Sequence, residues 1–346
     1  MELNERVKAF VQLGKVLQNF VQEKPWVDYS CGLTEEEYNS VNSVIKKAFQ
    51  HNGWFSENNV RQSIDGIVYL LNEENLSSWI SKYSFKETEK NVAVIMAGNI
   101  PMVGFHDLLC VLISGNKLEA KLSSEDSLLL PMVTNLLVKI EPQFQEKIKF
   151  VPRLNEFDAI IATGNDNSAR YFESYFEKYP NIIRKNRTSI AVFSGKETEQ
   201  ELDAFALDVF SYYGKGCRNV TKIFVPRNYN LDKLFKAFFP YKELVNNNKY
   251  ANNYDYNKAV YLMNSIELIE NGFLLLKEDE SLHSPLAVLN YEFYNSEEKV
   301  KSFIEQNLEK IQCIVSSENI PFGKAQKPEL WDFADGIDTL EFLAKL

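Results

Sequence analysis

The stretch "YYGKGCRNVTKIFVP" (212–226) places Cys217 directly after a glycine-rich turn and before a β-rich run. A thiol acts as a nucleophile through its thiolate, which nearby cations and helix N-termini favour. Lys215 and Arg218 are such cations, and the two glycines would let a substrate approach closely. The same pattern fits a small buried cysteine beside a turn, so the local sequence leaves both interpretations open. A dinucleotide loop is not expected, because the third glycine of GxGxxG is missing and the segment precedes a strand.

Composition bounds the class of protein. The chain has 346 residues, of which 45% are hydrophobic, enough for one large domain or two medium ones. With 38 basic and 48 acidic residues, the net charge of −10 argues against a nucleic-acid-binding surface. The cysteines are widely spaced without a CxxC pair, which fits a reducing compartment and not a disulfide framework. They are Cys31, Cys110, Cys217 and Cys313.

The sequence shows no targeting signal and no metal-binding motif. The first twenty residues carry charges throughout and lack the apolar core of a signal peptide. Every apolar run is interrupted well short of a membrane span. The three histidines, His51, His106 and His283, form no HExxH or similar ligand spacing. We therefore expect a cytoplasmic protein with no metal site, no membrane span and no nucleic-acid partner.

Periodicity divides the chain into a helical start and an alternating remainder. Residues 1–85 have helical spacing, and Thr34 with Glu37 three residues later forms a capping-box pattern. After residue 90, short apolar strands alternate with helices, which predicts a parallel, doubly wound sheet. Ligands of such sheets bind outside the carboxyl ends of the strands. Asn99, Ser123 and Gly164 all fall at expected strand ends.

Five segments occur along the chain in an order that indicates a family. They are "AGNIPMVGFHDLLCVLISGNKLEAKLSSED", "IIATGNDNSARY", "GKGCRNVTKIFVP", "ESLHSPLAVLNYEFY" and "IPFGKAQKPELWDFADG". This order resembles the aldehyde dehydrogenase superfamily, and within it most closely the acyl-CoA reductases of the LuxC type. The likeness covers roughly residues 90–346.

The resemblance implies an α/β fold with two doubly wound, Rossmann-like domains and an N-terminal helical region. It implies N-terminal helices and an NAD(P)-binding domain over residues 1–195 and a catalytic domain over 196–320. A C-terminal segment, 321–346, would return to the active-site cleft.

The resemblance also implies roles for two catalytic residues. Cys217 would attack an acyl carbonyl and become a thioester. Asn99 would donate its amide N–H to the oxyanion, with the Cys217 backbone N–H as second donor. Without the resemblance, the favoured interpretation of Asn99 is a side chain that closes the Asn-Ile-Pro turn.

Cofactor-binding positions follow from the same matched motifs. Lys121, with Ser123, would meet the adenine-side ribose or phosphate; the alternative is an ordinary exposed lysine. Gly164, Asn165 and Ser168 would bring the "TGNDNS" turn to the pyrophosphate, where helix N-terminal amides favour anions.

Two further motifs match the family pattern. Glu280 would hold the nicotinamide ribose, although one extra residue stands before the following Ser-Pro pair. Phe322 and Gly323 resemble a turn at the floor of the site, where packing and substrate contact are alternatives.

The stretch Arg184-Lys185-Asn186-Arg187 departs from the family pattern. Hydrolytic members carry a Glu-Leu-Gly-Gly stretch there, whose glutamate activates the deacylating water. Without that base, a thioester should pass to or from a thiol in preference to water. The basic residues could meet CoA phosphates or form a solvated surface turn. A serine, Ser124, stands where NAD-preferring members place a glutamate, which favours NADPH over NADH.

The resulting prediction is NAD(P)H-dependent reduction of a fatty acyl-CoA to aldehyde and CoA. Alternatives are a subunit that passes a Cys217 thioester to a partner, an oxidising aldehyde dehydrogenase, and a non-catalytic scaffold. Expected partners are acyl-CoA and an acyl-transferring or aldehyde-consuming protein. We expect a homo-oligomer in which the family's β-hairpin is reduced. Phe235, Phe238 and Phe239 could line an acyl tunnel or form helix core.

Overall fold

The computed structural model describes residues 1–27, 32–86 and 89–346, so Cys31 lies outside the described residues. The chain forms two compact units. The first comprises Met1–Lys185 and Glu329–Leu346, and the second comprises Asn186–Pro328. The expected boundary at residue 195 falls later, after strand β6 (Thr188–Val192), which pairs with strands of the second unit.

Four helices precede the first sheet, as the periodicity predicts. They are α1 (Leu3–Val21), α2 (Glu35–His51), α3 (Glu57–Leu70) and α4 (Glu73–Ile80). The capping box of α2 is confirmed: the Glu37 backbone N–H donates to Thr34 Oγ1 (3.2 Å), and the Thr34 N–H donates to Glu37 Oε2 (2.8 Å).

The first unit contains a five-stranded parallel sheet of order β3-β2-β1-β4-β5. Its strands are β1 (Asn91–Ile95), β2 (Lys117–Lys121), β3 (Ile148–Phe150), β4 (Ala159–Thr163) and β5 (Asn181–Arg184). The predicted doubly wound arrangement is therefore confirmed. Strand order reverses between β1 and β4, and the carboxyl ends at such a switch point form the ligand crevice of this architecture.

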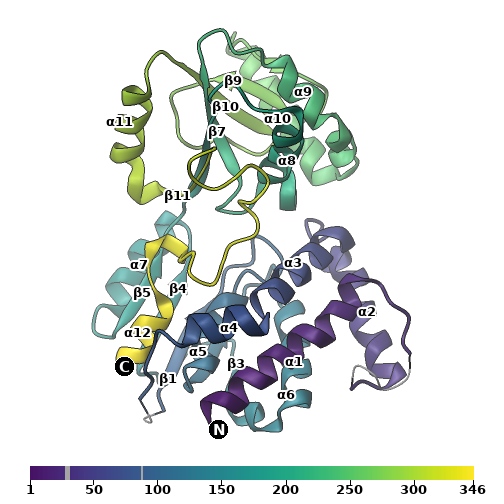
Figure 1. Cartoon of the computed structure of the whole chain (residues 1–346), viewed down its shortest axis with the longest axis vertical. Coiled ribbons are helices and arrows are strands. Elements are labelled where there is room, and N and C mark those ends of the chain that lie inside the picture. Colours follow the sequence, from purple (N-terminus) through teal and green to yellow (C-terminus); the bar gives the residue numbers. More distant parts are fainter. Residues whose placement is uncertain (28–31, 87–88) are drawn as a thin grey trace. The chain divides into compact units, whose positions relative to one another are not determined.

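Helices cover this sheet. Those of the first unit are α5 (Phe105–Ile113), α6 (Leu129–Ile140), the 3₁₀ turn η1 (Pro142–Glu146), α7 (Asp166–Phe176), η5 (Ala334–Gly336) and α12 (Thr339–Lys345). Helix α5 packs on β1 and β2, and the C-terminal helix α12 packs on α5. Figure 1 shows α12 beside the sheet of this unit.

The crossover from β3 to β4 is short and carries no helix along residues 151–158. Parallel strands are usually joined by a longer, helical crossover. Here Leu154 and Phe157 cover the sheet face together with Phe172 and Phe176 of α7. The loop is fixed because the Asn155 N–H donates to Glu119 Oε1 (3.2 Å).

The second unit contains a six-stranded sheet of order β11-β6-β7-β10-β9-β8, in which only the β8–β9 pair is antiparallel. Besides β6, its strands are β7 (Val220–Pro226), β8 (Ile269–Glu270), β9 (Leu275–Glu278), β10 (Val288–Tyr294) and β11 (Ile311–Val315).

Helices lie on both faces of the second sheet, with α11 on one side and α8, α9 and α10 on the other (Figure 1). They are α8 (Glu199–Phe210), η2 (Ser211–Gly214), α9 (Asp232–Phe238), η3 (Phe239–Asn246), α10 (Asn248–Met263), α11 (Glu297–Asn307) and η4 (Leu308–Lys310). Phe238 is fully buried against Phe205 and Phe210, whereas Phe239 is 60% exposed. Phe238 therefore belongs to the helix core. Among the described residues, no helix combines the length and apolarity needed to cross a bilayer.

Candidate functional site

Cys217 is exposed, in the turn between η2 and β7. The turn closes on itself: the Asn219 N–H donates to the Gly216 carbonyl (3.0 Å), and the Gly216 N–H donates to Asn219 Oδ1 (2.8 Å). Exposure contradicts the interpretation of Cys217 as a small buried residue. Its thiol is placed where a solvent-borne substrate can reach it.

Asn219 ties this turn to the end of helix α8. Its side chain is fully buried, and Nδ2 donates to the carbonyls of Asp208 (3.2 Å), Val209 (3.2 Å) and Ser211 (3.0 Å). These are carbonyls at the C-terminus of α8, which the helix itself leaves unsatisfied. One amide group therefore fixes both the Cys217 turn and the helix end.

The backbone leading to Cys217 is left-handed at three consecutive residues. The φ angles are 54° at Tyr212, 58° at Tyr213 and 78° at Gly214. Glycine adopts this conformation freely, but each tyrosine costs of order 1 kcal/mol or more. Such a run persists only where surrounding contacts enforce it, and it directs the chain into the Cys217 turn.

Asp208 of α8 holds a second segment against the Cys217 turn. Its carboxylate, fully buried, accepts hydrogen bonds from the N–H groups of Gly323 (2.6 Å) and Ala325 (2.9 Å). Arg218 Nε donates to the Ala325 carbonyl. Phe322 is buried against Phe193 and Phe205, so it is a packing residue of the floor.

Asp208 should make stability depend on pH. Burial raises its pKa from 3.8 to about 6, despite hydrogen bonds from Gly323 and Ala325 and the charge of Arg218, which lower it. Between these two pH values, Asp208 is protonated in the folded protein but ionised in the unfolded chain. Its contribution to the free energy of unfolding therefore falls as pH rises from about 4 to 6. Relative to Asp208→Asn, wild-type protein should lose about 3 kcal/mol in total as pH rises through this window, of which about 2 kcal/mol is lost between pH 4 and 6.

Chemical denaturation of both proteins across this pH range measures the effect. Asp203→Asn, at an exposed position on the same helix, is the matched control. Parallel pH profiles for wild type and Asp208→Asn would contradict the assignment.

Beneath the turn, Ser189 of β6 supports the Cys217 backbone. Its hydroxyl donates to the Cys217 carbonyl (3.0 Å) and lies 3.0 Å from Cys313 Sγ. Cys313 is buried on β11, so its thiol packs inside the unit. The Cys217 turn is thus held by Ser189 of β6 and, through Asn219, by the end of α8.

Glu280 is not brought to the Cys217 turn. It is exposed in the loop after the carboxyl end of β9, whereas Cys217 precedes the amino end of β7 in the same sheet. The loop then runs back along the sheet, where the Leu282 carbonyl accepts from Thr221 Oγ1 (3.0 Å). The residues of this loop that lie nearest to the Cys217 turn are therefore those after Leu282. The motif match pointed to Glu280 instead.

In the first unit, Asn99 is exposed in the turn that follows the carboxyl end of β1. Two neighbours hold this turn: Ser63 Oγ donates to the Pro101 carbonyl (2.6 Å), and Asp126 Oδ2 accepts from the Met102 N–H (2.6 Å). Burial raises the pKa of Asp126. Ser63 and Asp126 thus hold the turn from outside, and the Asn99 side chain is exposed.

Ser123 follows β2 and packs against the Asn99 turn through Gly98. A Cβ on Gly98 would lie 2.6 Å from both Cβ and Oγ of Ser123, so only glycine fits there. Lys121, the last residue of β2, is exposed, and no ion pair in the described part of the chain engages its ammonium. Asn99, Ser123 and Lys121 thus share one edge of the sheet, as predicted.

Gly164 begins the turn between β4 and α7. A Cβ there would meet Ser168 Cβ at 2.8 Å and Phe172 at 2.9 Å, so glycine allows the strand end to pack on the first turn of the helix. Asn165 is the N-cap of α7, and its Oδ1 accepts from the Ser168 N–H (2.8 Å). Asn165 and Ser168 therefore lie at the start of α7. Their hydrogen bond uses the backbone N–H of Ser168, one of the amides that the helix start would otherwise offer to a ligand.

These donors fit a nicotinamide dinucleotide at the carboxyl edge of the first sheet. The two glycine contacts create close strand-to-loop packing on both sides of the switch point between β1 and β4. Lys121 supplies a cation, Ser123 a hydroxyl, and α7 a helix start, groups that suit phosphate and ribose.

The basic stretch 184–187 begins at the last residue of β5, and that residue, Arg184, is neither free for CoA phosphates nor part of a solvated turn. Arg184 is buried and pairs with Asp107 (2.6 Å), while Arg187 Nη1 donates to the Ile311 carbonyl (3.3 Å). Lys185 is exposed and pairs with Glu173 (2.7 Å). Sequence alone could not tell these roles apart, because the partners are distant along the chain.

Sequence reasoning missed the residues that position the candidate groups. Asp208, Asn219 and Ser189 hold the Cys217 turn, and Asp126 holds the Asn99 turn. One signal was available: Asp208 lies within the apolar run "LDAFALDVF", where an acid must find a buried partner.

No family model matches this sequence, and no curated protein matches it. Solved structures do match. KauB, an aldehyde dehydrogenase from Pseudomonas aeruginosa, has a TM-score of 0.63 at 12% identity over 91% of this chain and 72% of that chain. AldA, an indole-3-acetaldehyde dehydrogenase from P. syringae in complex with NAD+ and IAA, has a TM-score of 0.62 at 12% identity, over 88% and 70%. Aldehyde dehydrogenase 21 from Physcomitrella patens, in complex with succinate, has a TM-score of 0.60 at 12% identity, over 91% and 76%. The fold is therefore aldehyde-dehydrogenase-like, as the sequence predicts.

Proposed function

We propose that this protein reduces an acyl-CoA thioester to aldehyde and CoA with a nicotinamide cofactor, through an acyl group on Cys217. The observation that carries the proposal is the exposed Cys217 thiol, on a turn whose backbone is held by Asn219 and Ser189. A rigid, accessible thiol in an aldehyde-dehydrogenase-like fold suits attack on a carbonyl.

The acyl-transfer step requires only groups of this chain. The Cys217 thiolate forms a bond to the acyl carbon, the bond from that carbon to the CoA sulfur breaks, and CoA leaves as a thiolate that takes up a proton. One thioester replaces another, so the step is close to energetically neutral. The Asn99 amide and the Cys217 backbone N–H would stabilise the oxyanion.

Lys121, Ser123 and the Gly164 turn would hold the dinucleotide at the carboxyl edge of the first sheet, with Asn165 and Ser168 shaping the start of α7. When bound, a reduced nicotinamide cofactor would supply a hydride to the acyl carbon, and Cys217 would leave as a thiolate to release the aldehyde. Ser124 leaves room for a 2′-phosphate, which supports NADPH over NADH. Glu125, next to Ser124, is exposed. Glu125→Gln removes a negative charge that would repel a 2′-phosphate, so this variant should prefer NADPH over NADH more strongly.

The fate of the thioester depends on a base. Within Arg184–Arg187 no carboxylate is available, and Arg184 is buried in an ion pair. Water is a poor nucleophile without a base, so a thiol such as CoA is the expected exchange partner.

An oxidising, hydrolytic dehydrogenase is the second candidate, favoured by one specific contact. The Asp335 carboxylate accepts a hydrogen bond from the Lys185 N–H (3.3 Å), so a carboxylate does lie against the basic stretch. Several structures of similar fold are named as aldehyde dehydrogenases, one with NAD+ and another with succinate. Asp335 is then the carboxylate to test as the base for water.

One set of assays separates the candidates. Wild-type protein is given NADPH or NADH with acyl-CoAs of graded length, and separately aldehyde with NAD(P)+ in the presence and absence of CoA. Cofactor oxidation with acyl-CoA supports the reductase. Acid release that is independent of CoA and lost in Asp335→Asn supports the hydrolytic enzyme. A stable acyl adduct without cofactor oxidation would instead indicate an acyl-transfer subunit. Light scattering tests the proposed homo-oligomer.

Asn99→Ala should lower kcat by about 10²- to 10³-fold, because one oxyanion donor is lost. The melting temperature should change little, since Asn99 is exposed. Asn135→Ala, also exposed and in the first unit, is the matched control. An unchanged kcat in Asn99→Ala would remove this residue from the mechanism.

A further inference from the structure

We infer that a small apolar cavity beside the Cys217 turn receives the end of the acyl chain, and that Leu286 sets the chain length accepted. The inference rests on the proposed function. The cavity lies within the second unit and has a volume of about 30 Å³. It is lined by residues on both sides of the nucleophile: Tyr213 and Gly214 before Cys217, and Val220 and Thr221 after it.

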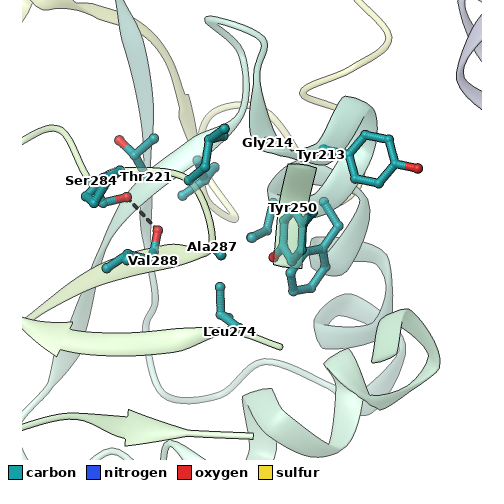
Figure 2. A pocket seen from close by; sticks show the side chains of 13 residues that line it. Tyr213, Gly214, Thr221, Tyr250, Leu274, Ser284, Ala287 and Val288 are labelled. Carbon is teal, nitrogen blue, oxygen red and sulfur yellow. Dashed lines mark hydrogen bonds between the residues drawn. The ribbon is translucent and has the colours of Figure 1, made fainter. Parts of the chain in front are cut away.

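Most of the side chains that line the cavity are apolar. Figure 2 shows its lining, which comes from α8, η2, β7, α10, the residue before β9, and the loop that leads into β10. Besides the residues that flank Cys217, the apolar side chains are Val209, Phe210, Leu274, Leu286, Ala287 and Val288. An aliphatic chain gains free energy by entering such a space.

Four residues at the cavity carry hydroxyls, Tyr213, Thr221, Tyr250 and Ser284, and two of these hydroxyls donate hydrogen bonds within the protein. Ser284 Oγ donates to the Val288 carbonyl (2.6 Å), drawn as the dashed line in Figure 2, and Thr221 Oγ1 donates to the Leu282 carbonyl (3.0 Å). A buried water needs two to four polar partners. The Ser284 and Thr221 protons are committed to backbone carbonyls, and most of the lining side chains are apolar, so the cavity suits an alkyl group.

The approach to the cavity is built from the left-handed segment before Cys217. A Cβ on Gly214 would come within 3.4 Å of the Val209 carbonyl and 3.9 Å of Leu286 Cδ2, so Leu286 faces Gly214 across the space. Tyr213 packs on Tyr250, with ring centroids 6.0 Å apart. The left-handed backbone thus contributes Tyr213 and Gly214 to the cavity, and α10 contributes Tyr250.

Its volume limits what fits. A space of this size holds about one water molecule or one methylene group. The end of an acyl chain fits, and each added carbon must displace a side chain. Leu286 is the residue to alter, because its side chain is half-buried while Asn257 Nδ2 holds its carbonyl at 2.9 Å.

The test compares Leu286→Ala and Leu286→Phe with wild type. Purified full-length proteins are given acyl-CoAs from acetyl to myristoyl. Intact-mass spectrometry reports acylation of Cys217, and cofactor absorbance reports turnover. Leu286→Ala should shift the optimum to acyl chains longer by about two to three carbons, with kcat/KM rising about fourfold per additional buried methylene. Leu286→Phe should shift it to shorter chains. Leu308→Ala, exposed in the same unit, is the control and should leave the optimum unchanged.

The outcomes distinguish the inference from the function on which it depends. If wild-type Cys217 is acylated but neither Leu286 variant moves the optimum, while both melt cooperatively like wild type, the cavity is not the acyl pocket. If no acyl-CoA acylates wild-type Cys217, the proposed function is wrong and the inference falls with it. Opposite shifts in the two variants support both.

Discussion

Cys217→Ala is expected to abolish acyl-enzyme formation and to lower aldehyde production from acyl-CoA by about 10⁴-fold or more, the scale seen when a nucleophile is removed. No other described cysteine can substitute, because Cys110 and Cys313 are buried. The melting temperature should stay close to that of wild type, since Cys217 is exposed. Intact-mass spectrometry after incubation with acyl-CoA and cofactor absorbance measure the two effects.

Cys110→Ala is the control for loss of a thiol. Cys110 lies in α5 of the first unit, where burial raises the pKa of its thiol well above the ordinary value, so it stays protonated. This variant should retain acylation. Normal aldehyde production by Cys217→Ala would rule out the covalent mechanism, whatever the fold.

Asp107→Ala is expected to destabilise the first unit by about 3–5 kcal/mol, because it leaves a buried guanidinium without its counter-charge. Arg184 Nη1 lies 2.6 Å from Asp107 Oδ2, with side chains 7% and 8% exposed. Burial by itself lowers the pKa of Arg184, but Asp107 outweighs it and raises that pKa overall. Chemical denaturation followed by circular dichroism measures the loss.

The same ion pair anchors the C-terminal helix. Arg184 Nη2 donates to Thr339 Oγ1 (2.7 Å), at the first residue of α12, and Tyr83 donates to Asp338 (2.7 Å) just before it. Loss of Asp107 should therefore release α12 first, which hydrogen exchange would detect as faster exchange over 339–345.

Two comparison variants sharpen this prediction. Glu173→Ala removes an ion pair of similar length, 2.7 Å, that is about half exposed, and it should cost about 0–1 kcal/mol. The double change Asp107→Leu with Arg184→Met should be more stable than Asp107→Ala alone, since no buried charge remains unpaired. Equal losses for Asp107→Ala and Glu173→Ala would contradict the assigned role.

The buried pair also bears on substrate recognition. Arg184 was a candidate for CoA phosphates, but its guanidinium is committed to Asp107 and Thr339. Phosphates of a CoA substrate must therefore be met by other cations.

Local patterns in the sequence were sufficient to predict the helices and strands, and to predict which residues lie at one edge of the first sheet. Thr34 and Glu37 predicted the start of α2, because a capping box involves residues only three apart. Strand and helix alternation predicted the parallel sheet, and parallel strands necessarily place their carboxyl ends together. Asn99 and Ser123 consequently fall at the same edge, without any knowledge of tertiary contacts.

Only the tertiary structure decided how buried polar groups are paired and where long loops run. Asp208 meets Gly323 and Ala325, more than a hundred positions later, and Arg184 at the end of β5 meets Asp107 on helix α5. Glu280 matched a motif by spacing, yet its loop carries it away from the Cys217 turn. The physical reason is that periodicity and capping depend on neighbours within a few residues. The partner of a buried charge depends instead on which distant segments pack together, and sequence spacing does not record that.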